Sequence, residues 1–281
     1  MKLITTSSEL TEFRNFLSDQ NKTVGFVPTM GALHKGHLSL VEQAEKVTDS
    51  VIVSIFVNPT QFNDPEDLKN YPSNLDNDLE MLRAYRKIDA VFAPAASDMY
   101  PVPDTRIFDF GHIDKIMEGS SRKGHFNGVA QIVSKLLSLV NPQKAFFGQK
   151  DFQQLIIINH LVKQLNIGVE IISCPIIREP DGLAMSSRNQ LLSPEERKHA
   201  ALISRTLFEA KIKATEMSVG NLKEWLTFTL NSDPLMRVEY FEIVDSLELK
   251  SVKSWDQPVV KVGCVAVRLG KIRLIDNLIF D

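Results

Sequence analysis

Two histidines three residues apart stand at the point where a predicted strand passes into a predicted helix. They are His34 and His37 of the segment TMGALHKGH, in which Gly31 and Gly36 let the backbone approach a ligand closely. A helix N-terminus presents unpaired N–H groups and the positive end of the helix dipole, so this position favours a bound phosphate. A turn with two solvated histidines is the alternative for an isolated pair. A zinc site is disfavoured because no third ligand has suitable spacing.

Amide side chains follow the next apolar run of the chain. The segment NPTQF comes directly after residues 51–57 and supplies Asn58 and Gln61. Neutral amides hydrogen-bond hydroxyl groups and carboxylates without adding charge, which suits a small polar substrate. Taken alone, Asn58 and the proline after it also fit an ordinary turn.

Two later segments supply cationic and hydroxyl groups. In FFGQKDFQQL, Lys150 lies at a turn two residues after Gly148 and can reach a phosphate. Asp151 is placed to cap the next helix, and Gln154 lies one turn further on. In GLAMSSRNQLL, residues 186–188 gather two hydroxyls and a guanidinium that could close over a triphosphate. A plain helix cap at Asp151 and a plain surface loop at residues 186–188 are the alternatives.

The elements that must position these groups alternate between strands and helices. Short β-branched or aromatic runs predict strands, and segments of helical period between them predict crossover helices. This pattern is typical of a Rossmann-like α/β fold with a doubly wound parallel sheet, which binds ligands beyond the carboxyl ends of its strands. The predicted strands cover residues 23–27, 51–57, 90–93, 144–147 and 169–173. A helix is predicted to start near Gly36 or His37, because Leu38, Val41, Ala44 and Val47 fall at helical spacing, and further helices are predicted over residues 74–87, 128–140 and 151–166.

After residue 177 the alternation of short strands and helices gives way to a long predicted helix followed by further strands. Ser193 and Glu196 form a predicted capping box, and Pro194 between them occupies the first position of a long helix. Further strands are predicted over residues 237–244, 259–267 and 272–275. We therefore predict a first domain over residues 1–176 and a second, smaller α+β domain over residues 177–281.

The composition excludes several classes of protein. Of the 281 residues, 43% are hydrophobic and 24% are charged, which is typical of a globular protein. The net charge of -3 disfavours a nucleic-acid-binding protein, which would be expected to carry a general positive charge. Cys174 and Cys264 form no CxxC pair and are expected to be buried, inert thiols. The opening residues contain no apolar stretch of signal-peptide length, and no apolar run is long enough to cross a bilayer, so we expect a cytoplasmic location.

Five segments together resemble one family, in order and across nearly the whole chain. They are TMGALHKGH, VSIFVNPTQF, EGSSRKGHFNGV, FFGQKDFQQL and DGLAMSSRNQ, and the combination is similar to the pantothenate synthetases, or pantoate–β-alanine ligases. The first segment is a variant of the HIGH motif, and MSSR resembles the KMSKS-like loop of the wider nucleotidyltransferase superfamily. The chain departs from the family at Gln149, where glutamate is usual, and at Phe152, where tyrosine is common.

The resemblance implies an ATP-dependent ligase of pantothenate and coenzyme A biosynthesis. The carboxylate of pantoate attacks the α-phosphorus of ATP, which releases pyrophosphate and leaves a pantoyl adenylate. The amine of β-alanine then displaces AMP. The resemblance also implies Mg²⁺ as the companion of ATP, with no protein ligand assigned, and a homodimer. The first domain would bind ATP and pantoate, and the second would close over the active site.

The resemblance also assigns residues to this chemistry, in which positioning and charge stabilisation do the catalytic work. The supporting pair Glu118 and Arg122 shapes the wall of the site, with a surface ion pair as the alternative. The catalytic residues are His34, His37, Lys150, Ser186, Ser187 and Arg188; the ATP site adds Met30, Gly31, Gly148, Asp151 and Met185; and the pantoate site comprises Met30, Asn58, Gln61 and Gln154.

Three other functions fit parts of the same pattern. A nucleotidyltransferase that moves AMP onto a phosphate shares the histidine motif, but the two glutamine-bearing segments and the second domain disfavour it. A nucleotide-sensing module predicts ATP affinity without pyrophosphate release. An RNA-binding synthetase relative is disfavoured because the chain is short and slightly acidic.

Overall fold

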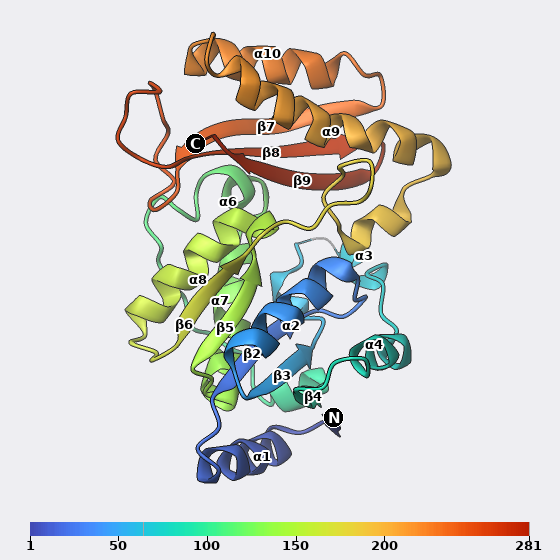
Figure 1. Cartoon of the computed structure of the whole chain (residues 1–281), viewed down its shortest axis with the longest axis vertical. Coiled ribbons are helices and arrows are strands. Elements are labelled where there is room, and N and C mark those ends of the chain that lie inside the picture. Colours follow the sequence, from blue (N-terminus) through green and yellow to red (C-terminus); the bar gives the residue numbers. More distant parts are fainter. Residues whose placement is uncertain (64, 281) are drawn as a thin grey trace. The chain divides into compact units, whose positions relative to one another are not determined.

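The computed structural model describes residues 1–63 and 65–280, which form two compact units (Figure 1). The first unit contains Met1–Gln149 and Ile157–Pro175, and the second contains Lys150–Ile156 and Ile176–Asp281. The short segment Lys150–Ile156 therefore packs with the second unit, although it follows a strand of the first. The predicted division into separate domains at residues 176 and 177 stays a prediction.

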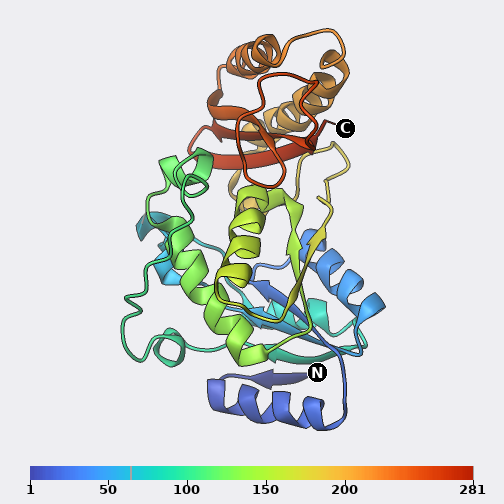
Figure 2. The same cartoon turned by 90° about the vertical axis from the view of Figure 1, so that its left-hand side faces the viewer.

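A six-stranded parallel sheet forms the centre of the first unit, with helices on both sides (Figures 1 and 2). Its order is β1-β4-β3-β2-β5-β6. Val51, Ile52 and Val53 of β3 are fully buried in succession, as expected for a strand covered on both faces. The predicted doubly wound fold is confirmed. The strands are β1 (Lys2–Ile4), β2 (Val24–Thr29), β3 (Ser50–Ile55), β4 (Ile88–Phe92), β5 (Lys144–Gly148) and β6 (Glu170–Cys174).

The helices of the sheet layer follow the predicted order with changed bounds. Helix α2 packs against β2, β3 and β5, and α7 packs against α1 and β2. The predicted helix over residues 74–87 is wrong at its end, because the chain leaves α4 after Leu82 and Lys87 donates its backbone N–H to Glu45 before β4 begins. The helices are α1 (Ser7–Asp19), α2 (Lys35–Val47), α4 (Leu75–Leu82), α7 (His125–Val140) and α8 (Phe152–Gln164). Shorter helices are α3 (Pro65–Lys69), α5 (Ala96–Met99) and α6 (Met117–Ser121), and the 3-10 helices are η1 (Pro59–Gln61) and η2 (Gln149–Asp151).

The winding of the sheet reverses between β2 and β5. Strands β3 and β4 extend on one side of β2, whereas β5 and β6 extend on the other. The parallel pairs Gly25↔Lys144 and Phe26↔Ala145 place the carboxyl ends of β2 and β5 at the same edge. Doubly wound sheets bind ligands at such a switch point, and TMGALHKGH and FFGQKDFQQL leave the sheet there.

A three-stranded antiparallel sheet covered by two helices forms most of the second unit (Figure 1). The predicted capping box is confirmed: Glu196 donates its N–H to Ser193 Oγ at 3.2 Å, and Ser193 donates its N–H to Glu196 Oε2 at 2.7 Å. Leucines and valines of the helices and sheet form a common core. The elements are η3 (Ser187–Leu191), α9 (Pro194–Lys213), α10 (Val219–Asn231), β7 (Met236–Asp245), β8 (Lys261–Leu269) and β9 (Ile272–Ile279).

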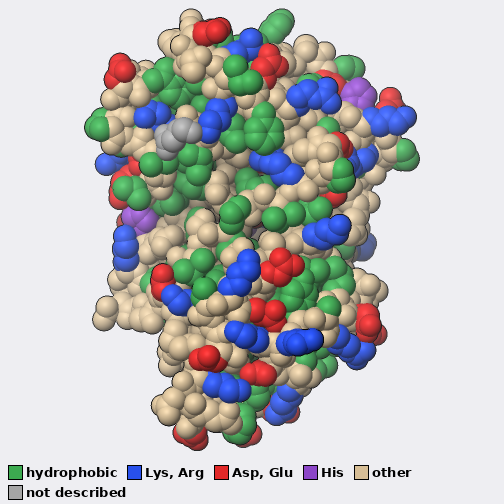
Figure 3. Space-filling model, in the orientation of Figure 1, with side chains coloured by type: hydrophobic (Ala, Val, Ile, Leu, Met, Phe, Trp, Pro, Cys, Tyr) green, Lys and Arg blue, Asp and Glu red, His purple; other side chains and the backbone are tan. Residues whose placement is uncertain are grey.

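The distribution of surface charge and the burial of the cysteines agree with what the composition predicted. Acidic and basic side chains are interspersed over the face in Figure 3, with no broad basic patch there. Within residues 1–63 and 65–280, no helix is long and apolar enough to cross a membrane. Both cysteines are buried, and burial raises the pKa of Cys174 to about 11, which suits an unreactive thiol.

Candidate active site

The two histidines of the first segment cap helix α2 with their own rings. His34 is the N-cap residue, and its Nδ1 accepts the N–H of Gly36 at 3.1 Å. His37 Nδ1 in turn accepts the N–H of His34 at 3.3 Å, and the ring centroids lie 4.0 Å apart. Because both Nδ1 atoms are acceptors, each neutral ring carries its proton on Nε2. The helix start therefore combines two imidazole N–H donors with the positive end of the helix dipole, a combination that favours an anion.

Asp78, which was not predicted as a site residue, holds the loop before these histidines. Its carboxylate is 1% exposed and accepts the N–H of Ala32 at 3.0 Å and of Leu33 at 2.7 Å. Burial raises the pKa of this carboxyl, while the two N–H groups act in the opposite direction. At Gly31, φ is +80°, and a Cβ there would lie 2.9 Å from Asp78 Oδ2, so the loop needs glycine.

The amide of Asn58 is fully occupied inside the first unit. Its Nδ2 donates to Gln61 Oε1 at 3.2 Å and to the carbonyl of Gly128 at 3.1 Å. Its Oδ1 accepts the hydroxyls of Tyr100 at 2.8 Å and of Thr60 at 3.2 Å. These bonds use both donors and both lone pairs of the amide, so Asn58 holds Gln61 in place, and its predicted contact with pantoate stays a prediction.

Gln61 is held from two further directions. Its Nε2 donates to Met30 Sδ at 2.9 Å, which joins two residues predicted to bind pantoate. Its backbone carbonyl lies 2.8 Å from Nδ1 of the buried His125. Arg122 Nη1 lies 3.2 Å from His125 Nε2, and because arginine can only donate, the ring carries its proton on Nδ1 and donates it to Gln61.

The supporting pair Glu118 and Arg122 extends this chain of contacts. Arg122 Nη1 lies 3.8 Å from Glu118 Oε2, and Glu118 is buried. The contacts therefore run from Glu118 through Arg122 and His125 to the backbone of Gln61. His125 lay inside the segment EGSSRKGHFNGV without an assigned role, and its spacing from Gln61 in the sequence gave no signal of the contact.

The remaining predicted residues belong to the second unit. Lys150 Nζ lies 3.8 Å from Asp151 Oδ2, and the carbonyl of Lys150 accepts the side-chain N–H of Asn277 at 2.9 Å. Ser186 is the N-cap of η3, and its Oγ accepts the N–H of Arg188 at 3.3 Å. The second unit contains Lys150, Asp151, Gln154, Met185, Ser186, Ser187 and Arg188, and the first contains Met30, Gly31, His34, His37, Asn58, Gln61, Glu118, Arg122 and Gly148.

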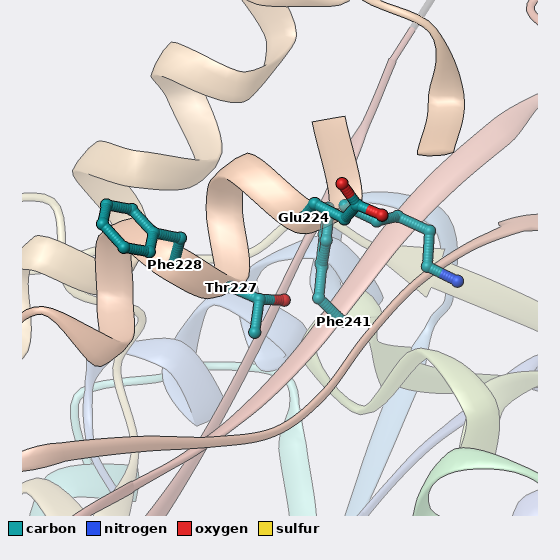
Figure 4. A pocket seen from close by; sticks show the side chains of 5 residues that line it. Glu224, Thr227, Phe228 and Phe241 are labelled. Carbon is teal, nitrogen blue, oxygen red and sulfur yellow. The ribbon is translucent and has the colours of Figure 1, made fainter. Parts of the chain in front are cut away.

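A pocket in the second unit does not coincide with any of these residues. It has a volume of about 370 Å³ and lies between α10 and β7 (Figure 4). Lys223, Glu224, Thr227, Phe228 and Phe241 line it, and Lys223 is already bonded to Glu242 at 2.6 Å. We place the candidate active site at the histidine-capped helix instead, because donors converge there at the switch point of the sheet.

The doubly wound fold and the histidine-capped helix N-terminus are typical of α/β enzymes that bind nucleotide phosphates. Comparison with known proteins identifies the chain further. The family model described as pantoate-beta-alanine ligase matches residues 2–279. The pantothenate synthetase of Phocaeicola vulgatus is 50% identical over 281 residues, covering 99% of both chains, and that of Porphyromonas gingivalis is 46% identical over the full length of both.

Solved structures give the same result. The pantothenate synthetase of Thermus thermophilus aligns with a TM-score of 0.92 at 41% identity, covering 99% of both chains. The pantoate-beta-alanine ligase of Francisella tularensis, solved as a complex with beta-gamma ATP and beta-alanine, aligns with a TM-score of 0.83 at 36% identity, covering 100% of this chain and 98% of that one. The chain belongs to the pantoate–beta-alanine ligase family, and the predicted ligase class is confirmed.

Proposed function

We propose that this chain condenses pantoate with β-alanine at the expense of ATP, through a pantoyl adenylate, and releases AMP and pyrophosphate. The observation that carries the proposal is the helix N-terminus capped by His34 and His37 at the switch point of the sheet. A carboxylate is a poor acylating agent, and joining its oxygen to phosphorus supplies the leaving group that the amine needs. The Francisella relative was solved with a nucleotide and β-alanine, which supports the same pair of substrates here.

In the first step, negative charge builds on the α-phosphate and on the departing pyrophosphate. We assign the Nε2–H groups of His34 and His37 as donors to phosphate oxygens, because the backbone bonds of their Nδ1 atoms hold both rings in place. Lys150 adds a positive charge. The proposed ATP site also includes Met30, Gly31, Gly148, Asp151, Met185, Ser186, Ser187 and Arg188. Loss of one such donor is expected to lower turnover by roughly 10²- to 10³-fold.

Gln61 and Gln154, with the backbone near Met30, hold pantoate in this proposal. Neutral amides bind hydroxyls and the carboxylate without neutralising the attacking oxygen. Asn58 is proposed to belong to the same pantoate site, where its Nδ2 also holds the amide of Gln61. Glu118 and Arg122 act through His125 on the backbone of the same glutamine.

Mg²⁺ is proposed to enter with ATP and to be bound mainly by the phosphates, since a hard cation that keeps several waters suits such a site. In the part of the chain that the structure describes, no group of three or more His, Cys, Asp and Glu residues is arranged to hold a metal ion. We also propose that the second domain closes over bound substrates, that the enzyme works in the cytoplasm, and that it is a homodimer. Sedimentation that shows only monomer would contradict the last point.

An isotope experiment tests the proposed reaction. Pantoate labelled with ¹⁸O in its carboxylate is incubated with ATP, Mg²⁺ and β-alanine, and the products are analysed by mass spectrometry. The adenylate route leaves one carboxylate oxygen on the phosphate of AMP, so AMP and pantothenate should form in equal amounts and AMP should carry ¹⁸O. Unlabelled AMP refutes the adenylate. A product that retains AMP favours the adenylyltransferase, and ATP binding without turnover favours the sensor.

A further inference from the structure

Two neighbouring residues of β9 are buried polar groups for which the family resemblance gave no role. Asp276 is 3% exposed and Asn277 is 2% exposed, inside a unit whose core cluster consists of hydrophobic residues. Burying an amide and a carboxylate is costly unless both are bonded. The hydrogen-bond partners of Asp276 and Asn277 therefore indicate the role of these two residues.

Asn277 is bonded to the residue that supplies the phosphate-binding ammonium group. Its Nδ2 donates to the backbone carbonyl of Lys150 at 2.9 Å, across 127 residues of sequence. A lysine side chain is long and flexible, so the position of its backbone decides which volume the ammonium can reach. The bond ties the base of that side chain to β9.

Asp276 holds a different segment through Arg178. Both carboxylate oxygens accept from this guanidinium, Oδ2 from Nη1 at 2.7 Å and Oδ1 from Nη2 at 3.0 Å. Nη1 also donates to the carbonyl of Gly182 at 3.0 Å. Oδ1 also accepts the N–H of Asn277 at 2.8 Å, so the contacts of Asp276 with Arg178 and of Asn277 with Lys150 are connected.

The segment held by Arg178 leads directly into MSSR. Arg178 pairs with Ala184, and Met185 donates its N–H to the carbonyl of Ile177 at 2.9 Å, so residues 177–185 form a narrow antiparallel ribbon. Ser186 follows this ribbon without an intervening residue. Burial raises the pKa of Asp276, while Arg178, the N–H of Asn277 and the charge of Lys150 act in the opposite direction, as expected for a buried carboxylate paired with a guanidinium.

We propose that Asp276 and Asn277 are positioning residues for the adenylation step: Asn277 fixes the backbone of Lys150, and Asp276, through Arg178, fixes the ribbon that carries residues 185–188. One strand of the second unit thus sets the spacing between two phosphate-binding segments that lie 35 residues apart in the sequence. The inference rests on the proposed function, because it assigns a role within that reaction.

A double-mutant cycle separates positioning from general stability. We would measure pantoate-dependent exchange of labelled pyrophosphate into ATP for Asn277→Ala, Lys150→Ala and the double variant, with urea unfolding of each. Asn277→Ala should lower exchange by about 10- to 100-fold in the wild-type background. It should lower exchange by less than about 3-fold once Lys150 is alanine, because the side chain that it positions is gone.

Trp255→Phe is the matched control. Trp255 Nε1 donates to the backbone carbonyl of Met217 at 2.7 Å, so this variant removes a bond of the same kind in the same unit. It should lower the urea midpoint and leave exchange within about 2-fold of wild type. As a second variant, Arg178→Lys keeps a cation beside Asp276 but loses the two-pronged contact, and it should raise the KM for ATP by about 10-fold.

The outcomes distinguish this inference from the proposed function. Equal losses from Asn277→Ala with and without Lys150, or a loss in Trp255→Phe of the same size, would overturn the positioning role while the reaction stands. Absence of pantoate-dependent exchange in the wild type would overturn the proposed function, and the positioning role with it.

Discussion

Gly128 of α7 lies so close to the Gln61 turn that one added methyl group should damage pantoate binding. A Cβ on Gly128 would lie 2.4 Å from the carbonyl oxygen of Thr60 and 2.8 Å from the Cα of Gln61. Contacts of a real Cβ essentially never fall under 3.0 Å, so the two backbones must separate by at least 0.6 Å, the difference between 3.0 and 2.4 Å. That shift also stretches the bond from Asn58 to the Gly128 carbonyl, which now measures 3.1 Å.

The Gly128→Ala variant should therefore lose both stability and substrate alignment. Overpacking costs about 1–3 kcal/mol of the free energy of unfolding, and a misplacement on the order of 1 Å can cost about 10²-fold in turnover. Pyrophosphate exchange measured against pantoate concentration should show a higher KM and a lower kcat, while ATP affinity stays within about 3-fold because His34 and His37 are untouched.

Gly168→Ala is the matched control for this change. Gly168 lies in the same unit as Gly128, and a Cβ at Gly168 would meet no atom within 4 Å, so the activity of this variant should equal that of the wild type. Gly128→Ala with kcat and KM for pantoate within about 2-fold of wild type would refute the idea that the close approach of α7 places Gln61.

Three further variants test separate contacts. His34→Asn keeps a side-chain acceptor for the helix N-terminus but removes Nε2, so the free energy of unfolding should change by less than about 0.5 kcal/mol while exchange falls roughly 10²-fold; a parallel loss of both would contradict this division. Asp78→Asn places an amide NH₂ group opposite the N–H groups of the loop, so it should lower the free energy of unfolding by about 1–3 kcal/mol and weaken ATP binding in titrations. Unchanged values of both would contradict the role of Asp78 in holding this loop. The Arg106 guanidinium holds the pKa of Asp104 well below its usual range, so the Asp104 carboxylate stabilises the fold above its ordinary pKa and loses this effect as the pH falls through its lowered value. Asp104→Asn should thus cost about 2 kcal/mol at pH 7 and progressively less below pH ~4, and a pH-independent difference would contradict this origin.

Local patterns were enough to predict the framework of the site. The apolar run of β3 and the helical spacing of Leu38, Val41 and Ala44 in α2 predicted burial, because a parallel sheet covers both faces of its strands and one face of each helix. Val47, the last residue of the same predicted spacing, is 53% exposed. The Ser193 capping box was predictable for a similar reason, since its two bonds join residues three apart. The three-residue strand β1 was not predicted, because so short a segment shows no alternation.

The contacts that orient the site residues could not be predicted from local patterns. Asp78 reaches a loop 45 residues earlier, His125 reaches Gln61 from 64 residues later, and Asn277 reaches Lys150 across 127 residues. Each of these residues is bonded to backbone groups that are distant in the sequence and come close only in the folded chain. A single sequence contains the partners but no sign of their pairing.

The most direct test of the account is pyrophosphate exchange into ATP without β-alanine, in wild type, His37→Ala and Lys150→Ala, with the exposed His112→Ala as a control. Omitting the amine isolates the first half of the reaction, so only the formation and reversal of the adenylate are measured. The account predicts exchange that requires pantoate, falls roughly 10²- to 10³-fold in the first two variants, and survives in the control. Wild-type protein that binds ATP but shows no pantoate-dependent exchange would contradict it.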